Sequence, residues 1–190
     1  MSFDTIEVSI KGVSPLILHN GQLANPMNKW AKAIKEISGR RKKTDEDFEE
    51  MARLEFMGSF YVNEKNVVVV PGVNIEAMLI AAAKQVRMGP KAKSGIVCDK
   101  DWPLLFDGPN KLEAMWKSGK FTDQRLVRVQ QARIVRTRPI FYQWALDFQI
   151  GYMPDILNLG DLKGFLKDAS YRIGLGDFRP KFGRFEIVKC

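Results

Sequence analysis

The sequence DLKGFLKDASYRIGLGDFRPKFGRFEIV, residues 161–188, combines a helix, a glycine-rich loop and a strand. Apolar residues recur at helical spacing in its first part, at Leu162, Phe165, Leu166 and Ala169. This spacing predicts a helix from about residue 161 to residue 171. Over residues 184–187 apolar and charged residues alternate, which predicts a half-buried closing strand.

The loop between this helix and this strand brings together three kinds of residue. Its glycines are Gly174, Gly176 and Gly183, its basic residues are Arg179, Lys181 and Arg184, and Phe178 adds an aromatic ring. Glycine lets a backbone come close to another surface, basic side chains neutralise phosphate, and an aromatic ring can stack on a base. The loop is therefore a candidate site for a polyanion. The alternative is a plain glycine-bent turn before the last strand.

The periodicity of the remaining chain predicts an α+β fold. Alternating apolar residues over 5–11 indicate a first strand, residues 60–70 a short hairpin, and residues 75–86 a helix capped by Asn74. The clearest strand covers residues 140–150, and Leu126–Arg136 is strand-like too, with Pro139 as a break between them. The resulting order is the ferredoxin-like (RRM-like) β-α-β-β-α-β core.

The length of 190 residues fits one domain spanning residues 1–190. Helical and loop insertions are expected at about 22–66 and 87–122. The first insertion contains a helix that begins near Pro26 and a second helix after Thr44, which forms a capping-box pattern with Asp47. The second insertion contains a short helix closed by Gly119.

Composition favours an anionic partner, because the net charge is +8 and the pI is about 9.5. Cys98 and Cys190 offer neither a disulfide framework nor metal-ligand spacing, and the aspartates at 99, 101 and 107 match no cation-binding loop. We therefore expect no metal and no other cofactor. The N-terminus has no signal-peptide pattern and no window is apolar enough to span a membrane, so a cytoplasmic location is expected.

Three motifs, in this order, resemble the repeat-associated mysterious protein (RAMP) superfamily. Ser14-Pro15-Leu16 followed by His19-Asn20-Gly21 resembles that superfamily's turn after the first strand, and residues 70–75 resemble its "I-P-G-S-S-I-K-G" helix entry. The glycines at 174, 176 and 183 resemble its glycine-rich loop. The best match is the backbone subunit of CRISPR interference complexes, which polymerises along a guide RNA. The chain also resembles phage and prophage proteins ending in "G-L-G-D-[F/W/Y]-R-P", which implies the cytoplasm of a bacterial host.

The resemblance implies a single-stranded RNA partner and a homo-oligomer or filament. It also implies that Arg179, Lys181 and Arg184 contact phosphates and that Gly174 and Gly176 let RNA approach the backbone. Two departures stand out. Glu76 replaces a helix-start lysine. RNA-cleaving subunits carry an Asp shortly after the first-strand turn, where this chain has Asn20, Gln22 and Asn25, so cleavage of that kind is not expected.

Other basic residues extend the candidate surface. If Leu126–Arg136 is a strand, Arg128, Arg136 and Arg138 share one face and could follow a nucleic-acid backbone. The alternative is an exposed strand whose charges prevent edge-to-edge aggregation. Lys91 and Lys93 lie in a basic loop, residues 87–95, that could clamp a single strand.

The sequence therefore predicts a non-catalytic protein that binds single-stranded nucleic acid and polymerises along it. RNA is favoured by resemblance, and single-stranded DNA stays open. One alternative is a metal-independent endoribonuclease that uses His19, the only histidine, as an acid or base, because histidine titrates near neutral pH. If the protein is not such an enzyme, His19 is a turn residue or a nucleic-acid contact. The other alternative is a structural protein whose basic surface docks an acidic protein partner.

Overall fold

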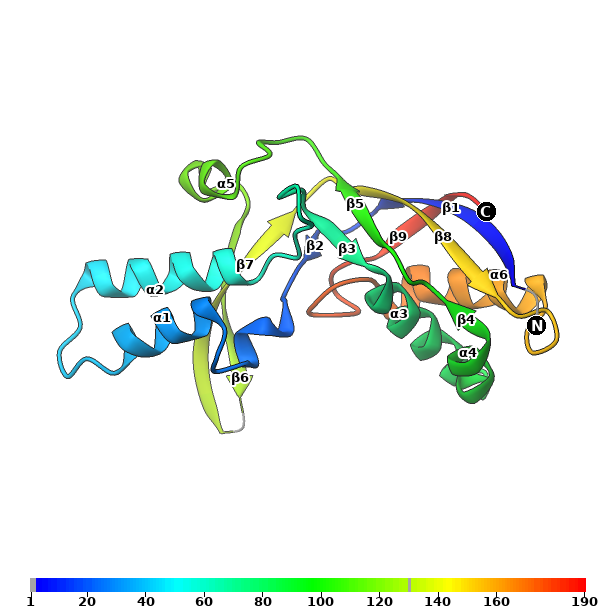
Figure 1. Cartoon of the computed structure of the whole chain (residues 1–190), viewed down its shortest axis with the longest axis horizontal. Coiled ribbons are helices and arrows are strands. Elements are labelled where there is room, and N and C mark those ends of the chain that lie inside the picture. The colour runs from blue at the N-terminus through cyan, green and yellow to red at the C-terminus, as the bar shows by residue number, and fades with distance from the viewer. Residues whose placement is uncertain (1–2, 130) are drawn as a thin grey trace. The chain divides into compact units, whose positions relative to one another are not determined.

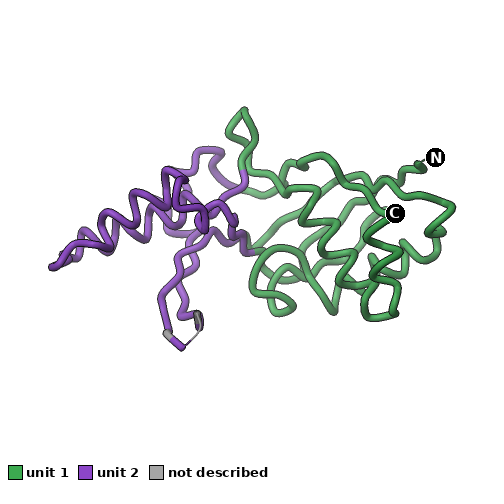
Figure 2. The backbone as a smooth tube through the Cα atoms, turned by 60° about the horizontal axis from the view of Figure 1, so that its bottom comes forward, with its two compact units in different colours: residues 1–16, 62–107, 141–190 green, residues 17–61, 108–140 purple. Residues whose placement is uncertain are grey.

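The computed structural model describes residues 3–129 and 131–190, which form two compact units (Figure 2). Unit 1 comprises the N-terminal segment up to Leu16 together with Val62–Asp107 and Phe141–Cys190. Unit 2 comprises Ile17–Tyr61 and Gly108–Ile140. The two segments of unit 2 overlap the insertions expected at about 22–66 and 87–122.

Unit 1 is built on a six-stranded antiparallel sheet (Figure 1). Its order is β3-β5-β8-β1-β9, and β4 pairs in addition with β8. The strands are β1 (Asp4–Gly12), β3 (Val69–Pro71), β4 (Ile96–Val97), β5 (Asp101–Leu105), β8 (Ala145–Tyr152) and β9 (Phe185–Lys189). The longest ladder joins β1 to β8, from Asp4 opposite Tyr152 to Lys11 opposite Ala145. The α+β class and the first and closing strands predicted from the sequence are confirmed.

Helices α3 (Gly72–Gln85) and α6 (Leu159–Asp168) lie along one face of this sheet, and α4 (Gly89–Gly95) packs against α3 (Figure 1). Val8 and Ile10 of β1 stand opposite Phe148 and Leu146 of β8, and all four side chains are buried. Each such burial contributes about 1.5–3 kcal/mol. The alternate residues of these strands, such as Glu7 and Asp147, are exposed, so the other side of β1 and β8 is polar.

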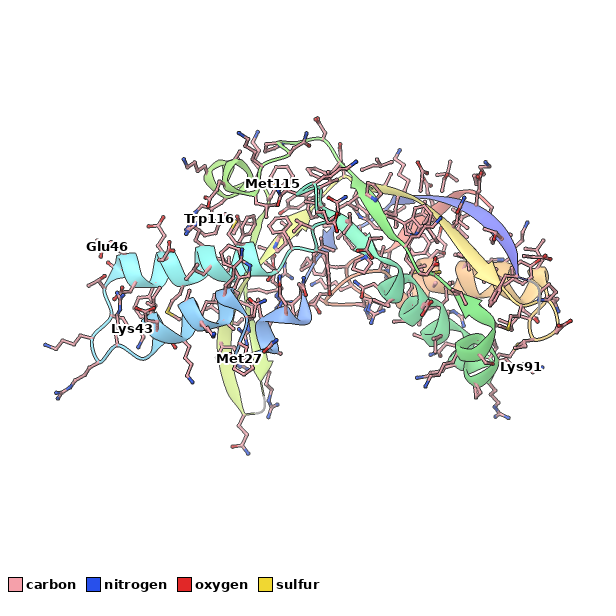
Figure 3. All side chains as sticks on the ribbon, in the orientation of Figure 1. Met27, Lys43, Glu46, Lys91, Met115 and Trp116 are labelled. Atoms are coloured by element: carbon pink, nitrogen blue, oxygen red, sulfur yellow. The ribbon has the colours of Figure 1, made fainter. Side chains whose placement is uncertain are left out.

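Unit 2 contains the helices α1 (Lys29–Ser38), α2 (Asp45–Gly58) and α5 (Leu112–Ser118) and a short 3-10 helix, Gly21–Ala24. The predicted capping box of α2 is confirmed, because Asp47 N–H donates to Thr44 Oγ1 at 3.3 Å and Thr44 N–H donates to Asp47 Oδ2 at 3.1 Å. Met115 and Trp116 lie on the side of α5 that faces α2 (Figure 3), and Trp116 packs against Phe56 with ring centroids 5.3 Å apart. The predicted α5 ends at Gly119, whose φ is +67°.

The three-stranded sheet β2-β7-β6 corrects two strand predictions. Its strands are β2 (Leu16–Ile17), β6 (Thr122–Val129) and β7 (Ala132–Phe141). The segment Leu126–Arg136 is therefore not one strand but a hairpin, and Pro139 lies within β7, opposite the first residue of β6. The long strand predicted over residues 140–150 is divided, because β7 ends at Phe141 and β8 begins at Ala145.

Three helix boundaries also differ from expectation. Helix α3 begins at Gly72, with Pro71 rather than Asn74 at its N-cap. A side chain at position 72 would place its Cβ 1.9 Å from the Cys98 carbonyl oxygen, so only glycine lets the helix start there. The basic segment 87–95 is not a loop, since it contains α4. Helix α6 ends at Asp168 and a π-helix, Ala169–Ile173, follows it.

A buried carboxylate joins α2 to β7, and its removal should destabilise the protein. Glu55 is buried, and its carboxylate accepts hydrogen bonds from Arg136 Nη1 at 2.6 Å and from Thr137 N–H at 2.8 Å. We expect Glu55→Ala to lower the unfolding free energy by about 3 kcal/mol, because Thr137 N–H is left buried without its acceptor. Urea unfolding followed by circular dichroism measures this loss.

The matched control for Glu55→Ala is Glu113→Ala, which removes an exposed carboxylate 2.6 Å from Arg53. An exposed ion pair of this kind contributes about 0–1 kcal/mol. Equal, small effects of the two substitutions would contradict the assignment of Glu55 as the clamp of β7.

Candidate nucleic-acid interface

The glycine-rich loop of unit 1 begins where the π-helix ends and closes on itself. Gly174 N–H donates to Ala169 O at 2.8 Å, which joins the start of the loop to the π-helix. Leu175 N–H donates to Gly183 O at 2.8 Å, and this bond connects the two ends of the loop. The side chain of Leu175 is buried beneath it. Four residues of the loop have positive φ: Gly174, Gly176, Phe178 and Gly183.

Two of the three glycines are required by the packing of the loop itself. A Cβ on Gly183 would lie 1.7 Å from Leu175 O, and a Cβ on Gly174 would lie 2.7 Å from Phe182 O. The expectation that Gly174 leaves room for RNA beside the backbone therefore has a competing explanation, since the loop's own carbonyl group occupies that space. Gly176 is the glycine of this loop that lines an open surface.

The turn after β1 meets this loop. Gly183 N–H donates to Pro15 O at 2.8 Å, and Arg184 N–H donates to Ser14 Oγ at 2.9 Å. Trp144 Nε1–H donates to Ser14 O at 2.8 Å from the other side of the turn. Two of the three motif segments singled out in the sequence are therefore in direct contact.

A hollow of about 460 Å³ lies between α3 and the glycine loop. Helix α3 contributes Ala81 to its wall, the π-helix contributes Arg172, and the loop contributes Gly176, Phe178 and Arg179. Both arginines are exposed, and 38 % of Phe178 is accessible to solvent. Phe178 also meets the ring of Phe182 edge-on, with centroids 5.9 Å apart. An accessible aromatic ring and two cationic side chains therefore line the same hollow.

One acidic group also lines this hollow. Asp177 Oδ1 accepts the Phe178 N–H at 2.8 Å, and this bond accompanies the left-handed conformation of Phe178. Lys181 and Arg184 follow in the same loop and are exposed. Around the hollow, the glycine loop and the π-helix therefore carry more positive than negative charge.

At the start of α3, in the third motif, Glu76 replaces the lysine expected from the resemblance, and its carboxylate has a structural contact. Glu76 Oε1 accepts the Cys98 N–H at 2.6 Å, so this carboxylate holds the segment after α4 against α3. Burial, with a smaller effect of the Glu76 and Asp99 carboxylates, raises the pKa of the Cys98 thiol to about 12. Cys98 is therefore protonated at neutral pH and is no nucleophile.

The net positive charge of the protein belongs almost entirely to unit 2. Unit 2 carries 16 Lys and Arg residues against nine Asp and Glu, a net charge of +7, whereas unit 1 carries 14 against 13, a net charge of +1. Residues 108–140 alone contain eight basic residues and two acidic ones. Electrostatic attraction of a polyanion is consequently strongest around unit 2.

The arginine series of unit 2 does not form the single face predicted from the sequence. Arg128 stands opposite Arg133 in the β6–β7 ladder, while Arg136 and Arg138 lie on the other face. Arg136 donates a hydrogen bond to the Glu55 carboxylate, and only 4 % of Arg138 is exposed to solvent. The prediction of a shared face for Arg128, Arg136 and Arg138 is wrong, because residues 126–136 form a hairpin instead of one strand. Arg128 is the exposed member of that set.

The remaining predicted residues are found at separate places. Lys91 and Lys93 are exposed on α4, and Figure 3 labels Lys91 on that helix. His19 belongs to unit 2; its ring is half-buried, with Nδ1 inside, and its carbonyl oxygen accepts the Tyr61 hydroxyl at 3.1 Å. Arg172 is not among the residues predicted from the sequence, because it stands between the predicted helix, which ends at about residue 171, and the glycine loop.

No family model matches the chain, and no curated protein matches it. Among the residues that the structure describes, no cluster of three or more His, Cys, Asp or Glu side chains could hold a metal ion. Within the same residues, no helix is both long enough and apolar enough to cross a bilayer.

The closed form of the glycine loop predicts a strong effect of a single methyl group. Gly183→Ala should lower the unfolding free energy by about 3 kcal/mol or more, because alanine is strained at a φ of +74° and its Cβ meets Leu175 O. The control is Gly164→Ala in α6, where the added Cβ meets nothing within 4 Å apart from its chain neighbours and the backbone of its own helix, and where the helix should gain about 0.5–1 kcal/mol. Urea unfolding measures both, and a Gly183→Ala protein as stable as the wild type would refute the loop geometry.

Proposed function

We propose that the protein binds single-stranded nucleic acid without cleaving it, and that it assembles along the strand. The observation that carries this proposal is the hollow beside α3, which Phe178 lines together with Arg172 and Arg179. Stacking of a base on an aromatic ring contributes about 1–3 kcal/mol and is available only where bases are unpaired. Cationic side chains that line the same hollow suit the phosphates that flank such a base. By resemblance, RNA is the favoured ligand and single-stranded DNA the alternative.

The strand order supports a ferredoxin-like core for unit 1. In that arrangement the first strand lies between the third and the fourth, and the second lies beyond the third. The order β5-β8-β1-β9 agrees with it if β5 is the second strand, with α3 and α6 as the two connecting helices. On this proposal β3, β4 and unit 2 are additions to the core. The same arrangement, together with the contact between the first-strand turn and the glycine loop, supports membership of the RAMP superfamily.

The proposed binding mode uses side chains rather than backbone groups. The N–H groups of Leu175 and Gly183 already donate within unit 1. The π-helix and the glycine loop therefore offer a ligand mainly their side chains, those of Arg172, Phe178, Arg179, Lys181 and Arg184. Contacts of this kind bind any sequence with little discrimination and weaken steeply with salt. Lys91, Lys93 and the basic surface of unit 2 would add contacts to a longer strand.

Fluorescence polarisation of a labelled ~30-nucleotide strand, as RNA and as DNA, tests this proposal across a salt series. We expect Arg172→Gln combined with Arg179→Gln to weaken binding by roughly tenfold or more and to reduce the salt slope by about 1 to 1.5, because two phosphate contacts are lost. Phe178→Leu should weaken binding by roughly tenfold with the slope unchanged, because it removes stacking alone.

Lys65→Gln is the matched control, since Lys65 is an exposed basic residue of unit 1 in the turn after Val62. It should leave affinity almost unchanged. A wild-type protein that binds neither strand at low salt would reject the proposed function. Cleaved RNA on a gel of the same samples would reject the non-catalytic part and direct attention to His19.

A further inference from the structure

The central strand β8 leaves part of one of its sides without a neighbouring strand. Strand β1 occupies one side of β8 over its whole length, while β4 and β5 share the other side (Figure 1). Only Leu104 and Leu105 of β5 pair with β8. The next residue toward β4 is Pro103, which has no N–H and so cannot continue the ladder. Residues 147–150 of β8, all of which the structure describes, are therefore paired with neither β4 nor β5.

The peptide group of Gln149 faces this gap. Consecutive residues of an antiparallel strand direct their N–H and C=O groups to opposite sides. Trp144 O accepts the Gly12 N–H on the β1 side at 2.8 Å, whereas Met153 N–H donates to Gly95 O on the β4 side at 2.9 Å. The odd-numbered residues of β8 thus direct these groups away from β1. Gln149 consequently offers the gap a donor and an acceptor side by side.

A hollow of about 330 Å³, the sheet slot, lies at this gap. Its floor is the row Val97, Gly151 and Thr5, whose members stand opposite one another across β4, β8 and β1. Gly151 leaves the middle of this row open, and the ring of Phe3 also lines the slot, with Cδ1 4.0 Å from the place of a Cβ on Gly151. The volume is near the lower end of the range for small-molecule sites, about 300–1,000 Å³.

The remaining lining of the sheet slot adds an aromatic ring and two opposite charges. Trp102 is half-buried, and its Nε1–H is buried without an acceptor among the residues that the structure describes. A turn of this ring toward the slot therefore breaks no hydrogen bond and brings an unused donor to a ligand. Asp99 and Lys100 line the same slot, and both are exposed.

We propose that the sheet slot binds a nucleotide, either free or at the end of a strand. A base is flat and carries a donor and an acceptor side by side, so it suits the rings of Phe3 and Trp102 and the peptide group of Gln149. Lys100 would contact the phosphate, and the Asp99 carboxylate would accept from the ribose hydroxyls. A ligand of this class uses every polar and aromatic group that the slot presents.

This site is separate from the hollow beside α3. Thr5 and Gln149 belong to the polar face of the sheet, while α3 and α6 lie along the other face. The proposal therefore goes beyond the binding of a strand by the glycine loop, and either one holds without the other.

Isothermal titration calorimetry of the nuclease-treated full-length protein with adenosine monophosphate (AMP) tests the sheet slot. We expect AMP to bind more tightly than adenosine, which lacks the phosphate, and than deoxy-AMP, which lacks one ribose hydroxyl. Lys100→Gln should weaken AMP binding by roughly fivefold or more without changing adenosine binding. Asp99→Asn should abolish the preference for AMP over deoxy-AMP. Both residues are exposed, so neither substitution should unfold the protein, and circular dichroism verifies this.

Further variants locate the bound AMP. Trp102→Ala should weaken AMP binding by roughly tenfold, because stacking is lost. Lys65→Gln and the double variant Arg172→Gln with Arg179→Gln should leave AMP binding unchanged. A competing ~30-nucleotide strand identifies the source of the nucleotide, since only a strand whose end enters the slot displaces AMP.

Three results would overturn the proposal. They are a wild type that binds no AMP at millimolar concentration, an AMP affinity that neither Lys100→Gln nor Asp99→Asn changes, and a loss of AMP binding in the Arg172 and Arg179 double variant. The last result would assign AMP to the hollow beside α3. Loss of strand binding alone, with AMP binding intact, would reject the proposed function and leave the sheet slot in place.

Discussion

The hydrogen bond from the Gly183 N–H to the Pro15 carbonyl oxygen determines how the candidate site of unit 1 is built. It joins the end of the glycine loop to the turn after β1, and the Gly183 carbonyl oxygen in turn accepts from Leu175 at the start of the loop. The turn after β1, the start of the glycine loop and the end of that loop therefore meet at Gly183. The contact is possible only without a side chain at position 183, because a Cβ would overlap the Leu175 carbonyl group.

The same constraint decides what the loop can offer a ligand. A glycine-rich loop on its own suggests exposed backbone N–H groups, which would cradle an anion. In this protein, the space that a side chain would take at Gly183 and at Gly174 is filled by carbonyl groups of the loop itself. The backbone is consequently used for internal bonds, while Arg179, Lys181 and Arg184 remain exposed. The chemistry available to a partner is therefore that of charged side chains and one aromatic ring.

Local signals in the sequence were sufficient for much of the fold. The capping box at Thr44, the alternation in β1 and the glycine at 119 each specify a conformation within a few residues, and each was found as predicted. The β6–β7 hairpin was missed because no Gly, Asn or Pro marks a turn between Val129 and Ala132, so the alternation continues through it.

The candidate site was only partly predictable for a related reason. The cluster of Arg179, Lys181 and Arg184 is local, and the sequence displays it directly. The burial of Arg138 and the engagement of Arg136 depend on the fold of unit 2 and on Glu55 in α2, which is distant in the sequence. Arg172 faces the hollow from a π-helix, and a sequence that continues helical periodicity gives no sign that the helix will widen.

Because the two units carry unequal charge, the salt dependence of binding would indicate which part of the protein the nucleic acid contacts. The glycine loop and the π-helix supply four exposed cations: Arg172, Arg179, Lys181 and Arg184. If each neutralised one phosphate of a single strand, the salt slope would be about −3. At physiological ionic strength, charges beyond about 8 Å from the strand are largely screened, so the net charge of unit 2 acts only where the strand passes close to it. A slope much steeper than that expected for the loop would therefore mean that the strand also runs past other basic residues, either Lys91 and Lys93 of α4 or the basic surface of unit 2.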